Sequence, residues 1–138
     1  MICKKFRAKA ASQITPELPA FRMDGDLAFA TTGIDMAGPI KVKDNEGKKF
    51  KSWIVLFVCP VSREIHLELV PNQTTFEFLL VLRKFISRFP PVNRIISDNA
   101  AYFKRASKDL KICQDFIRDP EVQAFLSKSH ITWEFITD

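Results

Sequence analysis

The 138-residue chain predicts an α/β domain built on a mixed five-stranded sheet with flanking helices. Two observations lead to this fold class. Three strand-like segments follow one another through short turns between residues 27 and 70, which is typical of an antiparallel meander. Two more strand-like segments, at 94–98 and 131–136, are each reached through helical sequence, which is typical of parallel strands added to a sheet.

The first two strands are predicted from apolar runs and the turn residues around them. Residues 27–36 are mostly apolar, and Gly38 with Pro39 is expected to end this strand. The turn residues of 44–47 then predict a hairpin. Residues 50–59 are too continuously apolar for an exposed strand, so we expect the second strand to be buried.

The third strand, residues 64–70, shows strict alternation. Ile65, Leu67 and Leu69 alternate with His66 and Glu68. Because successive side chains point to opposite faces of a sheet, we expect the three apolar residues to face the core and the polar pair to face solvent.

The first helix is predicted by a capping box, Thr74 with Glu77, followed by an apolar stripe that Pro90 ends. Residues 94–98 then form a short buried strand that ends on an acid. A basic helical stretch is expected over 101–112. Asp119 and Pro120 predict the start of another helix, before a last strand at 131–136.

The net charge of +5 is concentrated near the N-terminus. Lys4, Lys5, Arg7 and Lys9 are accompanied by no acid in residues 1–13. We therefore predict a basic arm or linker over 1–27 and a folded domain over 28–138. The arm is suited to nucleic acid or another anionic surface, and a solvated tail is an equally good reading of the charge alone.

Several classes of protein are disfavoured by the sequence. The longest apolar run, Trp53–Cys59, is far shorter than a membrane span, and no signal-peptide pattern opens the chain. Three cysteines that lie far apart do not suggest a disulfide framework. We expect an intracellular protein that makes no contact with a membrane.

Two acids occupy unusual positions in the predicted strands. Asp35 lies between Ile34 and Met36, and Asp98 ends the strand 94–98. If these strands are parallel neighbours, both carboxylates come to one end of the sheet, where hard oxygen ligands can hold a divalent cation. The alternative is that each is a strand-end acid in solvent or a cap for the next turn.

Four segments give the chain a family resemblance. Ser97-Asp98-Asn99-Ala100-Ala101-Tyr102-Phe103 resembles the segment around the second catalytic Asp of retroviral-type integrases. The other three are 32–39, 53–57 and 63–69, in the same order as in the family, and the match is nearest to integrases of Pao/BEL-type retrotransposons. The resemblance covers nearly the whole chain.

The resemblance implies a ribonuclease-H-like fold and DNA integration, with 3′-end processing and strand transfer at a site of two Mg²⁺ or Mn²⁺ ions. It makes Asp35 and Asp98 the catalytic metal ligands and Asn99 a supporting residue. It also implies a nuclear location and homo-oligomers that hold element ends and target DNA. Lys104, Arg105 and Lys108 follow Asp98 and, with the basic arm, are candidates for phosphate contacts.

The third acid of the family is harder to place. Glu134 lies 35 residues after Asp98, which is a spacing known in the family, but it falls in a predicted strand, whereas the family places this acid on a later helix. Glu134 is therefore a minor candidate, and we expect the third acid to lie beyond this chain and the fragment to be inactive alone. Cys3 resembles the end of the family's zinc module but lacks its partners, so no zinc is expected.

Two other readings are open. One is a non-catalytic nucleic-acid-binding or interaction module derived from an integrase, which would bind without metal and with strong salt dependence. The other is an unrelated nuclease of the same fold, which would degrade DNA without joining it. The family consists of polynucleotidyl transferases and endonucleases. The sequence does not decide whether this chain is itself such an enzyme.

Overall fold

The computed structural model describes residues 17–18, 20–23, 27–89, 91–98 and 115–136. Its elements, after a short 3₁₀ helix at Ala20–Arg22, are β1 (Thr31–Lys43), β2 (Lys49–Val58), β3 (Ile65–Val70), α1 (Thr75–Arg88), β4 (Arg94–Asp98), α3 (Pro120–Lys128) and β5 (Thr132–Ile136). The predicted helical stretch 101–112 lies outside the described residues. In the described ranges, no helix is long and apolar enough to span a membrane.

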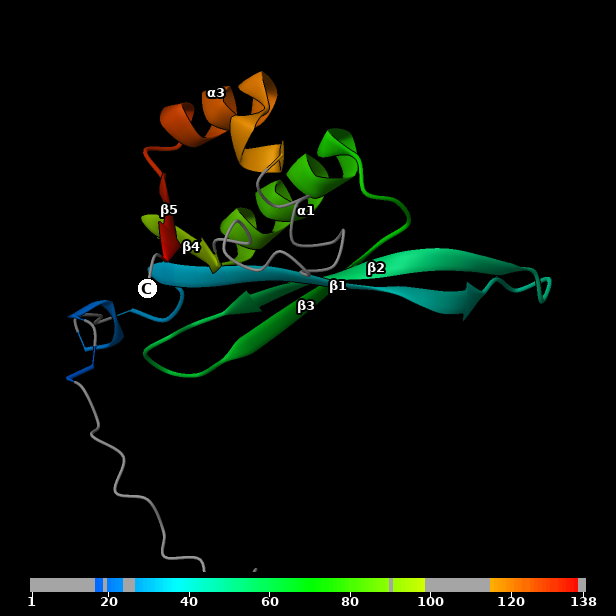
Figure 1. Cartoon of the computed structure of the whole chain (residues 1–138), viewed down its shortest axis with the longest axis horizontal. Helices are drawn as coiled ribbons and strands as arrows, with labels where there is room; N and C mark the ends of the chain where they lie inside the picture. The colour runs from blue at the N-terminus through cyan, green and yellow to red at the C-terminus, as the bar shows by residue number, and fades with distance from the viewer. Residues whose placement is uncertain (1–16, 19, 24–26, 90, 99–114, 137–138) are drawn as a thin grey trace, which may run out of the picture.

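The five strands form one sheet in the order β3-β2-β1-β4-β5 (Figure 1). β1, β2 and β3 pair antiparallel, whereas β4 pairs parallel with both β1 and β5. The predicted combination of a three-stranded meander with two parallel additions is confirmed. The order also brings β1, an early strand, next to β4, which is reached only after α1.

The helices α1 and α3 cover one face of the sheet, and this face holds the core (Figure 1). Phe85 of α1 stacks on Phe57 of β2, with ring centroids 4.0 Å apart. Val122 and Leu126 of α3 are buried in the same cluster. Each such side chain contributes roughly 1.5–3 kcal/mol through removal from water, so the core fixes the helices on this face.

Both helices begin at the predicted caps. The Thr74 hydroxyl accepts the backbone N–H of Glu77, and Asp119 Oδ1 accepts that of Glu121 at 2.9 Å. The second oxygen of Asp119 accepts a hydrogen bond from the Thr75 hydroxyl, 2.7 Å away. This bond, together with the backbone bond, lowers the pKa of Asp119 and joins the first turn of α1 to the cap of α3.

β1 extends past the residues that were expected to end it. Gly38 and Pro39 do not stop the strand, which continues to Lys43. The ladder shifts by one residue between Ala37 and Ile40, so a β-bulge accommodates the proline, which has no N–H to give to the ladder. Gly38 is required at this bulge, because its φ is +145° and a Cβ there would lie 2.8 Å from Cδ1 of Trp53.

β3 presents the opposite faces to those predicted. Ile65, Leu67 and Leu69 are 63%, 56% and 50% exposed, on the face without helices. His66 and Glu68 instead lie beneath α1, where their side chains are only 14% and 11% exposed. His66 packs against the rings of Phe57, Phe85 and Phe89. The prediction was wrong because His66 and Lys84 of α1 satisfy the Glu68 carboxylate, at 2.9 and 2.7 Å, so the polar pair can be covered.

Candidate functional site

The site is set by the parallel pairing of β1 with β4. The register runs from Thr31 opposite Arg94 to Ile34 opposite Ser97. Asp35 and Asp98 are the next residues of their strands, so their backbones lie side by side at the same end of the parallel ladder. The two strands are thus the parallel neighbours that the sequence argument required, and the meeting of the two carboxylates stays a prediction.

Asp35 lies on the face of the sheet that the described helices leave open. It alternates with Ile34 and Met36, which are 4% and 5% exposed on the covered face, whereas Asp35 is exposed. Its Oδ1 accepts the backbone N–H of Met36 at 2.8 Å. The other carboxylate oxygen has no hydrogen bond to any described residue, so it can accept a ligand from solvent.

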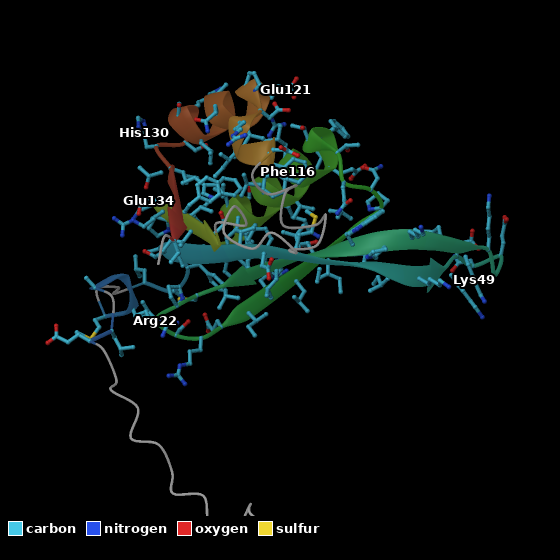
Figure 2. All side chains as sticks on the ribbon, viewed as in Figure 1. Arg22, Lys49, Phe116, Glu121, His130 and Glu134 are labelled. Atoms are coloured by element: carbon cyan, nitrogen blue, oxygen red, sulfur yellow. The ribbon has the colours of Figure 1, made fainter. Side chains whose placement is uncertain are left out.

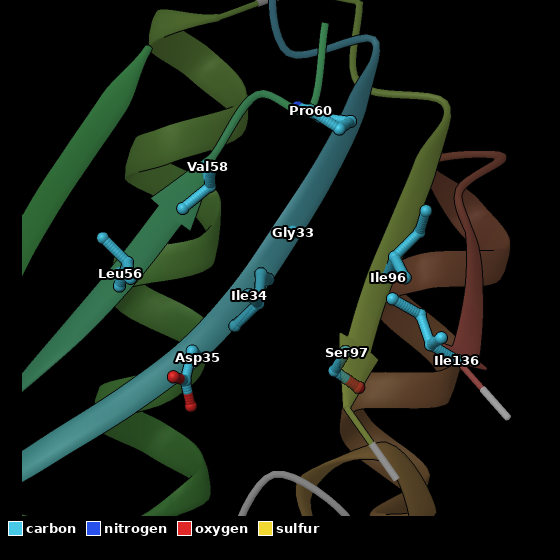
Figure 3. Close-up of a pocket in the computed structure, with 9 residues that line it drawn as sticks. All are labelled: Gly33, Ile34, Asp35, Leu56, Val58, Pro60, Ile96, Ser97 and Ile136. Carbon is cyan, nitrogen blue, oxygen red and sulfur yellow. The ribbon is translucent and has the colours of Figure 1, made fainter. Parts of the chain in front are cut away.

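A pocket of about 280 Å³ adjoins Asp35 on β1, β2, β4 and β5 (Figure 3). Its lining is mostly apolar, and Asp35 is the only acidic residue in it among the described residues. The lining residues are Gly33, Ile34, Asp35, Leu56, Val58, Pro60, Ile96, Ser97 and Ile136. The pocket therefore places one exposed carboxylate at the border of an apolar surface.

Ser97 and Trp133 support this end of the sheet. The Trp133 indole N–H donates to the Ser97 hydroxyl at 2.9 Å, across the pair β4–β5. The same indole packs 5.8 Å from the Phe78 ring of α1, measured between centroids. Sequence reasoning missed this contact, although a serine directly before the acid and a tryptophan in the last strand were the available signals.

Asp98 is the last residue of β4, and its backbone pairs with Ile136 of β5. Glu134 pairs with Ile96, and its carboxylate lies 3.4 Å from the Arg94 Nε. The Glu134 side chain is 52% exposed, so this ion pair contributes about 0–1 kcal/mol. Glu134 thus has a cationic partner at the start of β4, away from the strand end where Asp98 lies.

Several predicted residues lie outside the described part of the chain. They are Cys3, Lys4, Lys5, Arg7, Lys9, Asn99, Lys104, Arg105 and Lys108. Of the three cysteines, Cys59 is described and is a buried core thiol whose sulfur accepts the backbone N–H groups of Phe29 and Ser62. His130 is exposed just after α3 with a φ of +54°, so it takes part in the end of that helix.

Carboxylates at these two strand positions are the kind of donor that a hard divalent cation takes. Asp35 offers an exposed carboxylate oxygen, and the backbone of Asp98 places a second acid at the neighbouring strand position. Carboxylates are the ligands that Mg²⁺ and Mn²⁺ prefer. Within the described ranges, no three His, Cys, Asp or Glu side chains gather as a complete metal site.

The fold has counterparts among solved structures. No protein-family profile and no curated protein sequence matches the chain. Among solved structures, it resembles the HTLV-2 integrase catalytic core domain in complex with magnesium, in a trimeric and a dimeric form. The TM-score is 0.57 for both, at 17% and 19% identity, over 81% and 80% of this chain.

The chain has the ribonuclease-H-like fold of a retroviral integrase core. Its sheet order and its mixture of antiparallel and parallel strands agree with this fold. At this level of identity the likeness concerns the fold alone. The chain spans 62% and 63% of the length of these two structures.

Proposed function

We propose that the chain is a catalytic core of a Pao/BEL-type retrotransposon integrase, which acts on DNA through divalent cations held by Asp35 and Asp98. The β1–β4 register carries this proposal, because it brings both acids to one end of the parallel ladder. The likeness of the fold to integrase cores supports it, and so does the sequence resemblance of the four segments to the family.

Each residue of the site has a defined task in this proposal. Asp35 and Asp98 hold the cation, and Asn99 orients the site or touches the substrate. A divalent cation bound there would activate the attacking water or 3′-hydroxyl oxygen and stabilise the leaving oxygen in 3′-end processing and strand transfer. The Ser97–Trp133 bond keeps β4 and β5 in register, so that Asp98 keeps its position beside β1.

We expect this chain alone to have little strand-transfer activity. Asp35 and Asp98 are two carboxylates, and Glu134, the minor candidate for the third, forms an exposed ion pair with Arg94. The protein would work as a homo-oligomer in the nucleus. The neighbouring integrase cores are described in dimeric and trimeric forms, which supports this proposal.

The metal proposal is tested by titrating Mg²⁺ and Mn²⁺ into the purified chain and measuring heat of binding. Asp35→Asn and Asp98→Asn should each weaken binding by about tenfold or more, because each removes a charged oxygen ligand. Glu46→Gln, in the exposed turn after β1, is the matched control and should bind as the unmodified chain does. Equal affinity in all four proteins would contradict the assignment.

A second candidate function is a non-catalytic nucleic-acid-binding module. It is favoured by one observation, the basic arm with Lys4, Lys5, Arg7 and Lys9, which no acid accompanies in residues 1–13. DNA binding that is unchanged in EDTA and falls steeply with salt, without any nicking or joining in Mn²⁺, would establish this function. Metal-dependent nicking that Asp35→Asn abolishes would establish the enzyme instead, and degradation without joining would indicate a nuclease.

A further inference from the structure

The end of the β1–β2 hairpin leaves the sheet as a two-stranded ribbon. Figure 1 shows β1 and β2 running past the other strands, and Lys49 is labelled near the tip of this ribbon in Figure 2. Residues 40–51 contain five lysines and two acids, so this short stretch carries a net positive charge. The ribbon is therefore a basic projection from the folded part of the chain.

The ladder places four of these lysines on one face. Lys41 is paired with Lys51, and Lys43 with Lys49. The residues between them, Val42 and Phe50, are paired with each other and point to the opposite face. The bulge after Ala37 produces this match, because a one-residue shift moves the later side chains of β1 to the other face. We call these four residues, Lys41, Lys43, Lys49 and Lys51, the lysine face.

Like charges opposite each other across two strands destabilise a hairpin. All four lysines are exposed, and among the described residues none of them has a carboxylate within 4.0 Å. The nearby Asp44 is used by the turn, since its Oδ1 accepts the backbone N–H groups of Glu46 and Lys48. The ribbon thus maintains two repulsive pairs that the fold does not neutralise.

The shape of the ribbon suits a regular polyanion. Alternate residues on a strand lie about 7 Å apart and the two strands about 5 Å apart, so the lysine face is a compact array of cations. The major groove of DNA, about 12 Å wide, admits a two-stranded ribbon, and phosphates border it on both sides.

We propose that the lysine face binds the phosphate backbone of duplex DNA. The choice of DNA rests on the proposed function, whereas the contact itself needs neither Asp35 nor a metal ion. The ribbon continues the strand that carries Asp35, and Lys41 lies six residues further, or about 20 Å along it. Beyond the bulge the lysines lie on the helix side of the sheet, the face opposite to Asp35. The lysine face is therefore a contact with DNA separate from the carboxylate end of the sheet, and it does not read base sequence.

The test compares three variants of the full chain, each with four basic residues changed to Gln. The first changes the lysine face, the second changes the arm residues Lys4, Lys5, Arg7 and Lys9, and the third changes Arg22, Arg88, Arg118 and Lys128, which are exposed elsewhere. Binding to a fluorescent duplex is measured by anisotropy in EDTA over a salt series. All three variants lose the same net charge, so differences between them report which basic residues bind the duplex.

At low salt, the lysine-face variant should bind the duplex at least about tenfold more weakly than the third variant does. A plot of the logarithm of its binding constant against the logarithm of salt concentration should be less steep, by about 0.9 for each phosphate that it no longer binds. A variant with arginine at the same four positions should retain binding. The thermal unfolding temperature of the Gln form should be unchanged or higher, because the repulsive pairs are gone. A folding defect therefore does not account for the expected weakening.

Equal weakening of the lysine-face variant and the third variant would overturn the proposal, and so would loss of binding in the arm variant alone. A larger loss of affinity for poly-glutamate than for DNA would indicate an acidic protein partner and would overturn it as well. Mg²⁺ titration of the lysine-face variant separates the two proposals. Intact metal binding with unchanged DNA binding contradicts only the role of the lysine face.

Discussion

The two faces of the sheet differ in what covers them. The face beneath α1 and α3 holds the aromatic core and also the polar pair His66 and Glu68. The other face carries exposed apolar residues on β3, and Asp35 beside the pocket. Polarity therefore does not decide which face is covered, provided that each buried polar group has partners.

Removing the centre of the covered face should have the largest effect on stability. Phe85→Ala should lower the free energy of unfolding by about 3–5 kcal/mol, because Phe85 is fully buried and stacks on Phe57. Leu67→Ala, on the open face, should change it by about 0.5 kcal/mol or less. Urea unfolding of both variants measures the difference, and equal losses would show that the open face is covered in solution.

A smaller effect is expected at the bulge, where the side chains of β1 change faces. Gly38→Ala should cost about 2 kcal/mol, because it combines a positive φ with a contact of 2.8 Å to the Trp53 ring. Gly47→Ala is the control, since it has a φ of +82° but nothing within 4 Å of its Cβ. Thermal unfolding should rank Gly38→Ala as the more damaging change, and the reverse order would contradict the described bulge.

The polar pair on the covered face should make stability depend on pH. Burial raises the pKa of Glu68, but the hydrogen bonds from Lys84 and His66 outweigh it and leave the pKa below its ordinary value of 4.5. A carboxyl group with a lowered pKa stabilises the fold above pH 4.5, and this contribution is lost as the pH falls through the lower folded value.

Glu68→Gln should therefore lower stability by about 1–2 kcal/mol at pH 7 and by less as the pH falls below about 4. Glu46→Gln, in the exposed turn, should leave the pH profile unchanged. Urea unfolding between acidic and neutral pH measures both variants. If the free energy of unfolding of Glu68→Gln varied with pH in the same way as that of the unmodified chain, the buried pair would not stabilise the fold through the lowered pKa of Glu68.

The sequence was sufficient for the order of the strands along the chain and for their antiparallel or parallel direction, but not for their faces. Strict alternation in residues 65–69 defines two faces without saying which one lies under a helix. That choice depends on Lys84, which is sixteen residues from Glu68 in the sequence and lies on α1. The length of β1 could not be predicted either. It depends on the pairing with β2, where a bulge accommodates the proline that was expected to end the strand.

For the site, the sequence was sufficient to place Asp35 and Asp98 at strand positions that become neighbours. It could not give the contacts between strands, such as Trp133 to Ser97 or Glu134 to Arg94, because these depend on the β4–β5 register. The lysine face was also missed, although a Lys-x-Lys pattern stands on each side of the predicted turn. Only the bulge brings the two patterns onto one face.

The proposal that the end of the β1–β4 ladder holds a divalent cation can be examined by adding Mn²⁺ to the isotope-labelled chain. Paramagnetic broadening in the amide spectrum reports which residues lie near the bound ion. We predict that broadening begins at Ile34, Asp35, Ser97 and Asp98, and that Asp35→Asn abolishes it. Broadening centred elsewhere, for example on the 44–47 turn, or broadening that persists in Asp35→Asn, would contradict the proposed metal site.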